Sequence, residues 1–186
     1  MKFYHVVTEK PMKLNQIILF DDKHRNGVAK RIDRVIELSH AKNNKIENLT
    51  AFDKIVLNDF EHWTNIAKRE LILEKVRKKQ FSEYPSRLSC LYVSTSLNDA
   101  EVWSDYFIEI GRVTHQIVEL ECDGNHFTGD AHNCWYECPL DEEALEKAYH
   151  YWSNCENRKD EIPIYETIID GNIKVNRIIK EFKEKL

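Results

Sequence analysis

The stretch CLYVSTSLNDAEVW, residues 90–103, joins a short apolar strand directly to the start of a helix. Its first part, up to Val93, consists of aliphatic, aromatic and β-branched residues of the kind found in strands. Ser96 then precedes Asp99 by three residues, which is the spacing of a helix N-cap and its acidic partner. The stretch therefore predicts a strand that ends near residue 94 and a helix that follows it.

Upstream of this stretch, helical periodicity dominates. Residues 3–7 and 16–20 predict two short strands, and residues 28–39 predict an amphipathic helix. Apolar residues at intervals of three or four then predict a long helix over residues 46–78; they are Leu49, Phe52, Val56, Phe60, Trp63 and Ala67. The cationic end of that helix suits the negative end of the helix dipole, so its lysines need no nucleic acid contact to explain them.

Downstream, the pattern predicts three further strands, over residues 113–121, 164–169 and 173–175. A loop is expected over residues 122–139, and a charged helix over residues 141–153. Asp170-Gly171 is a favoured hairpin turn, and a lysine-rich helix is expected to close the chain. Strands and helices do not alternate regularly, which favours the α+β class over a doubly wound sheet.

Composition limits the class of protein. The chain has 186 residues, of which 42% are hydrophobic, with only 5 Gly and 4 Pro, so we expect a single domain over residues 1–186. There is no secretory leader, and no apolar run approaches the roughly 18 residues of a membrane span. Five Cys without a Cys-x-x-Cys pair favour reduced thiols. These features predict a cytoplasmic protein with no membrane partner.

Four potential zinc ligands lie close together in the sequence: His126, His132, Cys134 and Cys138. Zinc sites usually draw on ligands in tight, paired spacings, and these residues match none of the familiar patterns. We therefore expect no metal site here. Neither a Gly-x-Gly-x-x-Gly loop nor a Walker loop is present, so the common nucleotide-binding folds are not indicated.

Three segments, taken in chain order, resemble the ADP-ribosyltransferase superfamily. They are Tyr4-His5, Tyr92-Val93-Ser94-Thr95-Ser96 and the late segment that runs from Tyr165 to Val175. In that superfamily an opening His or Arg, a middle Tyr or Ser-Thr-Ser and a late Glu come from three strands that line one NAD cleft. The late segment looks most like the DNA-targeting bacterial toxin branch. The whole chain also looks like a small uncharacterised bacterial family that has been grouped with the superfamily.

The resemblance implies an α+β fold with a mixed or antiparallel split β-sheet core and flanking helices, and it implies NAD as the substrate. ADP-ribose would pass to an unknown acceptor, a protein or a nucleic acid. His5 would hydrogen-bond the adenosine-side ribose, and Tyr92 would stack on nicotinamide. Ser94 or Thr95 would position the ribose or the carboxylate. Cleavage of the nicotinamide–ribose bond develops an oxocarbenium-like cation, which the carboxylate of Glu166 would stabilise.

Two questions stay open at this point. Many members of the superfamily carry a Glu-x-Glu or Gln-x-Glu pair, which Glu166 lacks and which Glu119-Leu120-Glu121 supplies on an earlier strand. Glu166 is the preferred catalytic residue, with Glu121 as the alternative. The chain could also be a non-catalytic nucleotide-binding or interaction module on the same scaffold, or an NAD glycohydrolase with water as the acceptor. Burial in a strand would explain His5 without any ligand.

Overall fold

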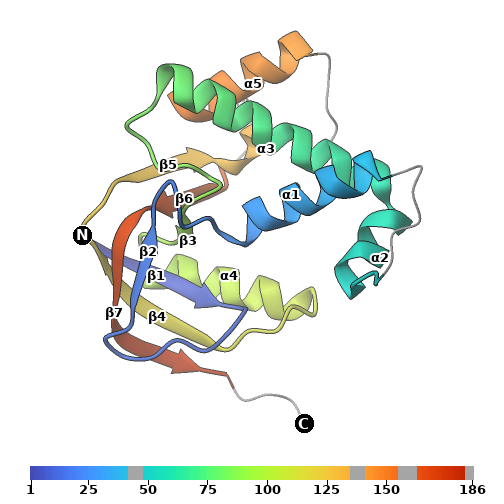
Figure 1. Cartoon of the computed structure of the whole chain (residues 1–186). Helices are drawn as coiled ribbons and strands as arrows, with labels where there is room; N and C mark the ends of the chain where they lie inside the picture. Colours follow the sequence, from blue (N-terminus) through green and yellow to red (C-terminus); the bar gives the residue numbers. More distant parts are fainter. Residues whose placement is uncertain (42–47, 135–140, 155–162, 183–186) are drawn as a thin grey trace. The chain divides into compact units, whose positions relative to one another are not determined.

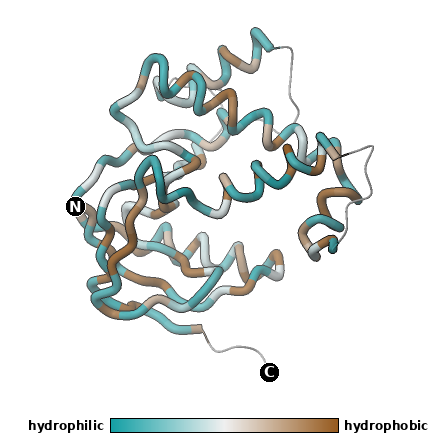
Figure 2. Tube along the Cα trace, in the orientation of Figure 1, coloured by the Kyte–Doolittle hydropathy of each residue, from teal (hydrophilic) through white to brown (hydrophobic). Residues whose placement is uncertain are grey.

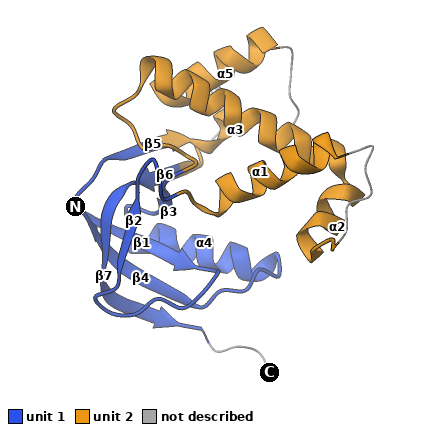
Figure 3. Ribbon diagram, viewed as in Figure 1, with its two compact units in different colours: residues 1–24, 89–128, 166–186 blue, residues 25–88, 129–165 orange. Residues whose placement is uncertain are grey.

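The computed structural model describes most of the chain, in four ranges: residues 1–41, 48–134, 141–154 and 163–182 (Figure 1). The chain forms two compact units, which Figure 3 shows in different colours. Unit 1 combines residues 1–24, 89–128 and 166–186, and unit 2 combines residues 25–88 and 129–165. Each unit is therefore assembled from segments that lie far apart in the sequence.

Unit 1 contains most of the strands and one helix. These elements are β1 (Lys2–Val7), β2 (Ile17–Phe20), β3 (Leu91–Val93), α4 (Leu97–Glu109), β4 (Gln116–Cys122), β5 (His126–Asp130), β6 (Tyr165–Ile169) and β7 (Gly171–Glu181). The chain passes between the two units within β5 and within β6. The larger sheet has the antiparallel order β1-β4-β7-β2, and the smaller sheet has the order β3-β6-β5. Two separate sheets with helices confirm the predicted α+β class and its split sheet.

Alternating side chains of β1 cover both faces of the larger sheet. Val7 is buried in one cluster with Val93 and Ile169 of the smaller sheet. Val6 is buried in another cluster with Ala100 of α4. Successive residues of a strand point to opposite faces, so residues of the smaller sheet and of α4 pack on opposite sides of β1.

Unit 2 is mainly helical. Its helices are α1 (Gly27–His40), α2 (Ala51–Asn58), α3 (Phe60–Gln80), the 3₁₀ helix η1 (Ala131–Asn133) and α5 (Asp141–Ser153). The buried face of α1, with Ile32 and Val35, packs in one cluster with Val56 of α2 and Ala67 of α3. None of the helices in the described part of the chain combines the length and the apolar character that a membrane-spanning helix needs.

The long helix predicted over residues 46–78 is interrupted. It is present as α2 and α3, which meet at Asp59, where φ is −136° and ψ is 62°. A capping box starts α2: Thr50 Oγ1 accepts from the Asp53 backbone N–H at 3.1 Å, and the Asp53 carboxylate accepts from the Thr50 N–H at 2.8 Å. The apolar spacing persists across the break because both helices pack in the same cluster.

The helix predicted at the end of the chain is wrong. β7 occupies this segment as an 11-residue strand and pairs with both β4 and β2. Ile173 and Val175 are fully buried in the larger sheet, and this packing overrides the local lysine content. Asp170-Gly171 is also not a hairpin turn, because β6 belongs to the smaller sheet and β7 to the larger one. Gly171, with φ of 78°, carries the chain from one sheet to the other.

Candidate functional site

The three strands that carry the predicted site residues are neighbours. β1 forms a single bridge to β3, in which Tyr4 N donates to Ser94 O at 2.9 Å and Ser94 N donates to Tyr4 O at 2.7 Å. β3 pairs with β6, and the last aligned residues are Val93 and Thr167. Ser94 directly follows Val93 and Glu166 directly precedes Thr167, so both residues lie next to the last aligned pair. Ser94 therefore lies between β1 and β6.

Strand alternation sorts the predicted residues onto two faces. Residues that lie opposite each other in an antiparallel pair share a face, so Tyr92, Ser94 and Glu166 share one face of the β3–β6 pair. Tyr4 lies opposite Ser94 and shares that face, whereas the next residue, His5, points to the other side of β1. The structure thus places the side chains of Tyr92, Ser94 and Glu166 on one face and the side chain of His5 on the other side of β1. This differs from the single shared surface that the resemblance implies.

The imidazole of His5 is tied to the middle strand. Nδ1 lies 2.8 Å from the carbonyl oxygen of Tyr92, so Nδ1 carries the proton and donates it. Burial lowers the pKa of His5 to about 4, although the hydrogen bond to Tyr92 opposes this change, and the positive charge of Arg112 lowers the pKa further. The ring is therefore neutral at pH 7. Its Nε2 atom keeps a lone pair that can accept a hydrogen bond.

The remaining predicted residues differ in their exposure. Ser94 is buried, Tyr92 and Glu166 are half-buried, and Thr95 is exposed. Among the residues that the structure describes, the Ser94 hydroxyl has no hydrogen-bond partner. Buried hydroxyls usually have one.

The competing carboxylates lie on β4. Glu121 is exposed, and its Oε2 lies 3.1 Å from Asn176 Nδ2. Glu119 is buried rather than solvated, and Lys2 Nζ lies 3.1 Å from its Oε2. β4 pairs with β1 and β7 in the larger sheet and borders neither β3 nor β6. Glu121 is consequently not on the strand that pairs with β3, whereas Glu166 is.

Within the loop expected over residues 122–139, residues 126–133 form β5 and η1, and residues 135–139 lie outside the described ranges. Within the described ranges, no group of three or more His, Cys, Asp or Glu is placed to hold a metal ion, and Cys138 lies outside those ranges. His132 Nδ1 lies 3.3 Å from Asp130 Oδ1. The described cysteines, Cys90, Cys122 and Cys134, form no disulfide with one another.

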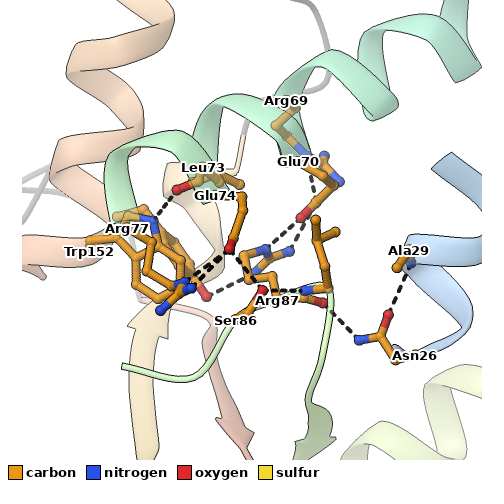
Figure 4. A network of polar contacts seen from close by, with 12 residues as sticks. Asn26, Ala29, Arg69, Glu70, Leu73, Glu74, Arg77, Ser86, Arg87 and Trp152 are labelled. Atoms are coloured by element: carbon orange, nitrogen blue, oxygen red, sulfur yellow. Dashed lines mark hydrogen bonds and ion pairs between the residues drawn. The ribbon is translucent and has the colours of Figure 1, made fainter. Parts of the chain in front are cut away.

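Sequence analysis missed a buried ionic network in unit 2 (Figure 4). The side chains of Arg87 and Glu70 are 6% and 1% exposed, and Arg87 Nε lies 2.8 Å from Glu70 Oε2. Arg69 Nη2 approaches Glu70 at 2.8 Å, and Arg87 Nη1 donates to the Tyr151 hydroxyl at 2.8 Å. Burial alone would raise the pKa of Glu70, but the two guanidinium groups hold it below its usual value. The carboxylate is therefore ionised inside the protein.

A second ionic group lies one turn along α3. Glu74 accepts from Arg77 Nη2 at 2.9 Å and from Ser86 Oγ at 2.8 Å. Arg77 also donates to the carbonyl oxygens of Ser82 and Tyr84, at 3.3 and 2.9 Å. These contacts fasten the segment after α3 back onto the helix, which is a structural role. The signal in the sequence is the helical spacing that places Glu70, Glu74 and Arg77 on the buried face of α3.

A family model with the description "Protein of unknown function (DUF2441)" matches residues 3–181, a range that includes both units and all of the predicted site residues from His5 to Glu166. No curated protein matches the chain. Since the match covers almost the whole sequence, the chain belongs to the DUF2441 family.

Proposed function

We propose that this DUF2441 protein binds NAD beside the junction of β1, β3 and β6 and transfers ADP-ribose to a macromolecular acceptor. The observation that carries the proposal is the position of Ser94. It bridges Tyr4 on one side. On the other side it directly follows Val93, which pairs with Thr167, the neighbour of Glu166, so the three segments of the superfamily resemblance converge near one residue. These segments are separated by about 90 and 70 residues in the chain, and only the fold brings them together.

The residues on this face suit the proposed chemistry. The half-buried carboxylate of Glu166 would stabilise the cation that develops on the ribose as nicotinamide leaves. Tyr92 offers an aromatic ring on the same face for the nicotinamide cation. A ribose hydroxyl would give the Ser94 hydroxyl the partner that it lacks among the described residues. Thr95, which is exposed, would border the same site.

In this proposal His5 supports the site from behind. Its hydrogen bond to the Tyr92 carbonyl ties β1 to β3 at the residue whose ring faces the nicotinamide. Because His5 points to the other side of β1, the proposal gives it no direct contact with the ribose, unlike the role expected from the resemblance. The absence of a disulfide among the described cysteines is compatible with the reducing cytoplasm, which we propose as the compartment.

A second candidate function is a nucleotide-binding module without catalysis. The direction of His5 favours it, because an active site of the superfamily would use the opening His or Arg together with the late Glu. Either function requires NAD to bind, so binding is the first test. The acceptor, a protein or a nucleic acid, would matter only for the transferase.

Calorimetric titration of the intact protein with NAD tests the proposal. We expect binding, and we expect Ser94→Ala to weaken it roughly two- to tenfold, since a hydrogen bond between uncharged groups contributes roughly 0.5–1.5 kcal/mol. The bridge to Tyr4 uses only backbone atoms, so this variant should fold normally. Ser96→Ala is the matched control and should bind NAD as the wild type does. A wild-type protein that takes up no NAD would contradict the proposal.

A further inference from the structure

Helix α4 carries a row of exposed apolar side chains. Val102, Tyr106 and Ile110 are spaced four residues apart and are 62%, 49% and 56% exposed. Val113, 59% exposed, follows after the helix ends. In Figure 2 the trace of α4 correspondingly carries both hydrophobic and hydrophilic segments. Large apolar side chains that gather on one side of a helix mark a surface that binds a partner more often than isolated ones do.

A row of carboxylates runs beside the apolar row. Glu101, Asp105 and Glu109 each precede one of the apolar residues, so the two rows are separated by about 100° around the helix axis. All three side chains are exposed, and none has an ion-pair partner among the described residues. The exposed half of α4 therefore presents an apolar strip with an acidic border.

The opposite half of α4 holds this surface in place. Ala100 and Ser104 are buried, and Trp103 and Phe107 pack against the cluster that contains Val6 and Ile117 of the larger sheet. The ring of Tyr106 meets that of Trp103 edge-on, with centroids 5.9 Å apart. The side chain of Tyr106 is thus held in place before a partner binds, which reduces the conformational entropy lost on binding.

We propose that this surface, Val102, Tyr106, Ile110 and Val113 with the carboxylates of Glu101, Asp105 and Glu109, docks a cationic amphipathic helix of a partner protein. The apolar face of such a helix would cover the apolar row, and its Lys or Arg residues would pair with the acidic row. The proposal is independent of NAD.

Charge argues against two other occupants of the α4 surface. α4 contains no Lys or Arg, so a second copy of this helix in a two-fold contact would offer the acidic row no cation. An anionic membrane surface would also repel the three carboxylates. A basic helix is the partner whose charge is complementary to the border of the apolar strip.

Fluorescence anisotropy with the intact protein tests the proposal. The probe is a labelled 18-residue peptide in which Leu and Lys are arranged to form one apolar and one basic helical face. We expect saturable binding that weakens at least tenfold for a scrambled peptide of the same composition. The double variant Val102→Ser/Tyr106→Ser should weaken binding of the amphipathic peptide to a similar degree. Equal binding of the scrambled peptide would overturn the proposal.

Charge reversal separates specific docking from general attraction. The exposed positions should tolerate Glu101→Lys/Asp105→Lys/Glu109→Lys, which should lose the Lys peptide and gain a matching Leu–Glu peptide. The same reversal on α5, Glu142→Lys/Glu143→Lys/Glu146→Lys, changes the net charge equally and should leave binding within about twofold. Equal losses in the two variants would overturn the proposal. So would self-association or vesicle binding that disappears with Val102→Ser/Tyr106→Ser, because the surface would then serve another occupant.

Discussion

The Nδ1 atom of His5 lies 2.8 Å from the carbonyl oxygen of Tyr92, so a side chain holds the first strand against the middle one. The backbone contact between these strands is limited to the single bridge of Tyr4 and Ser94. Next to that bridge, the neutral imidazole donates to the carbonyl oxygen of Tyr92. In a regular pair of strands, a backbone N–H would be the donor to such a carbonyl. The same contact determines which way His5 points and which of its nitrogen atoms is protonated.

Low pH should reduce the stability of the folded protein because of His5. The pKa of His5 falls from 6.5 to about 4 on folding, so the unfolded chain binds this proton more tightly than the folded protein does. The stabilising contribution is complete above about pH 6.5 and is lost as the pH falls toward 4. The free energy of unfolding, measured with urea at pH 7.5 and at pH 5, should fall less between these pH values for His5→Asn than for the wild type. Asn keeps a hydrogen-bond donor but does not titrate. Equal losses for wild type and variant would show that His5 is not buried in its neutral form.

Gly171 should be much less replaceable than Gly111. Both have positive φ, 78° and 75°, so alanine at either position carries a backbone penalty of roughly 1–2 kcal/mol. A Cβ on Gly171 would also lie 2.8 Å from the Cα of Gly124, whereas a Cβ on Gly111 meets nothing within 4 Å. Thermal unfolding should therefore give Gly171→Ala a much lower melting temperature than Gly111→Ala. Similar melting temperatures would contradict the close approach of Gly171 to Gly124.

Removal of the Glu70 charge should be strongly destabilising. Glu70→Gln leaves the guanidinium of Arg87 buried without its counter-charge, which costs about 3–5 kcal/mol. Glu143→Gln, in a surface pair with Lys147 at 3.2 Å, should cost less than about 1 kcal/mol. The free energy of unfolding from urea titrations measures both. The paired replacement Glu70→Leu/Arg87→Met should recover part of the loss, and the absence of any recovery would show that the loss does not come from the uncompensated charge of Arg87.

Ser96 should matter for stability and not for NAD. Its Oγ accepts from the backbone N–H of Asp99 at 3.1 Å and donates to the Asp99 carboxylate at 2.6 Å, so it caps α4. Ser96→Ala should cost about 1 kcal/mol of stability by urea unfolding. NAD affinity measured by calorimetry should stay within about twofold of wild type. A tenfold loss of affinity would place Ser96 in the site and assign the Ser-Thr-Ser segment a larger role.

Elements with a strong local signal could be predicted from the sequence. The N-cap predicted at Ser96 marks the start of α4. The charged helix predicted over residues 141–153 is present as α5. The end of the chain could not be predicted, because β7 owes its conformation to pairing with β4 and β2, which lie far away in the sequence. The break at Asp59 also escaped prediction, since apolar spacing continues through it.

The candidate site was predictable in part. The order of the three segments anticipates that β1, β3 and β6 are neighbours, and the structure has this arrangement. The face of each residue depends on register, however, and a slip of one residue exchanges the two faces of a strand. The pairing of Tyr4 with Ser94, which directs His5 away from Glu166, is a tertiary contact without a local signal. The same applies to the burial of Glu70 against Arg87.

Release of nicotinamide from NAD tests the proposed function most directly. Wild-type protein should release nicotinamide, measured chromatographically, in the presence of a protein or nucleic acid acceptor or by slow hydrolysis. Glu166→Gln should abolish release while leaving NAD affinity within about tenfold, because the lost charge acts mainly on the cationic transition state. Glu121→Gln, on β4, should release nicotinamide as the wild type does. Loss of activity in Glu121→Gln with activity retained in Glu166→Gln would contradict the assignment of the catalytic strand. NAD binding without release by the wild type would contradict the transferase and leave the binding module in its place.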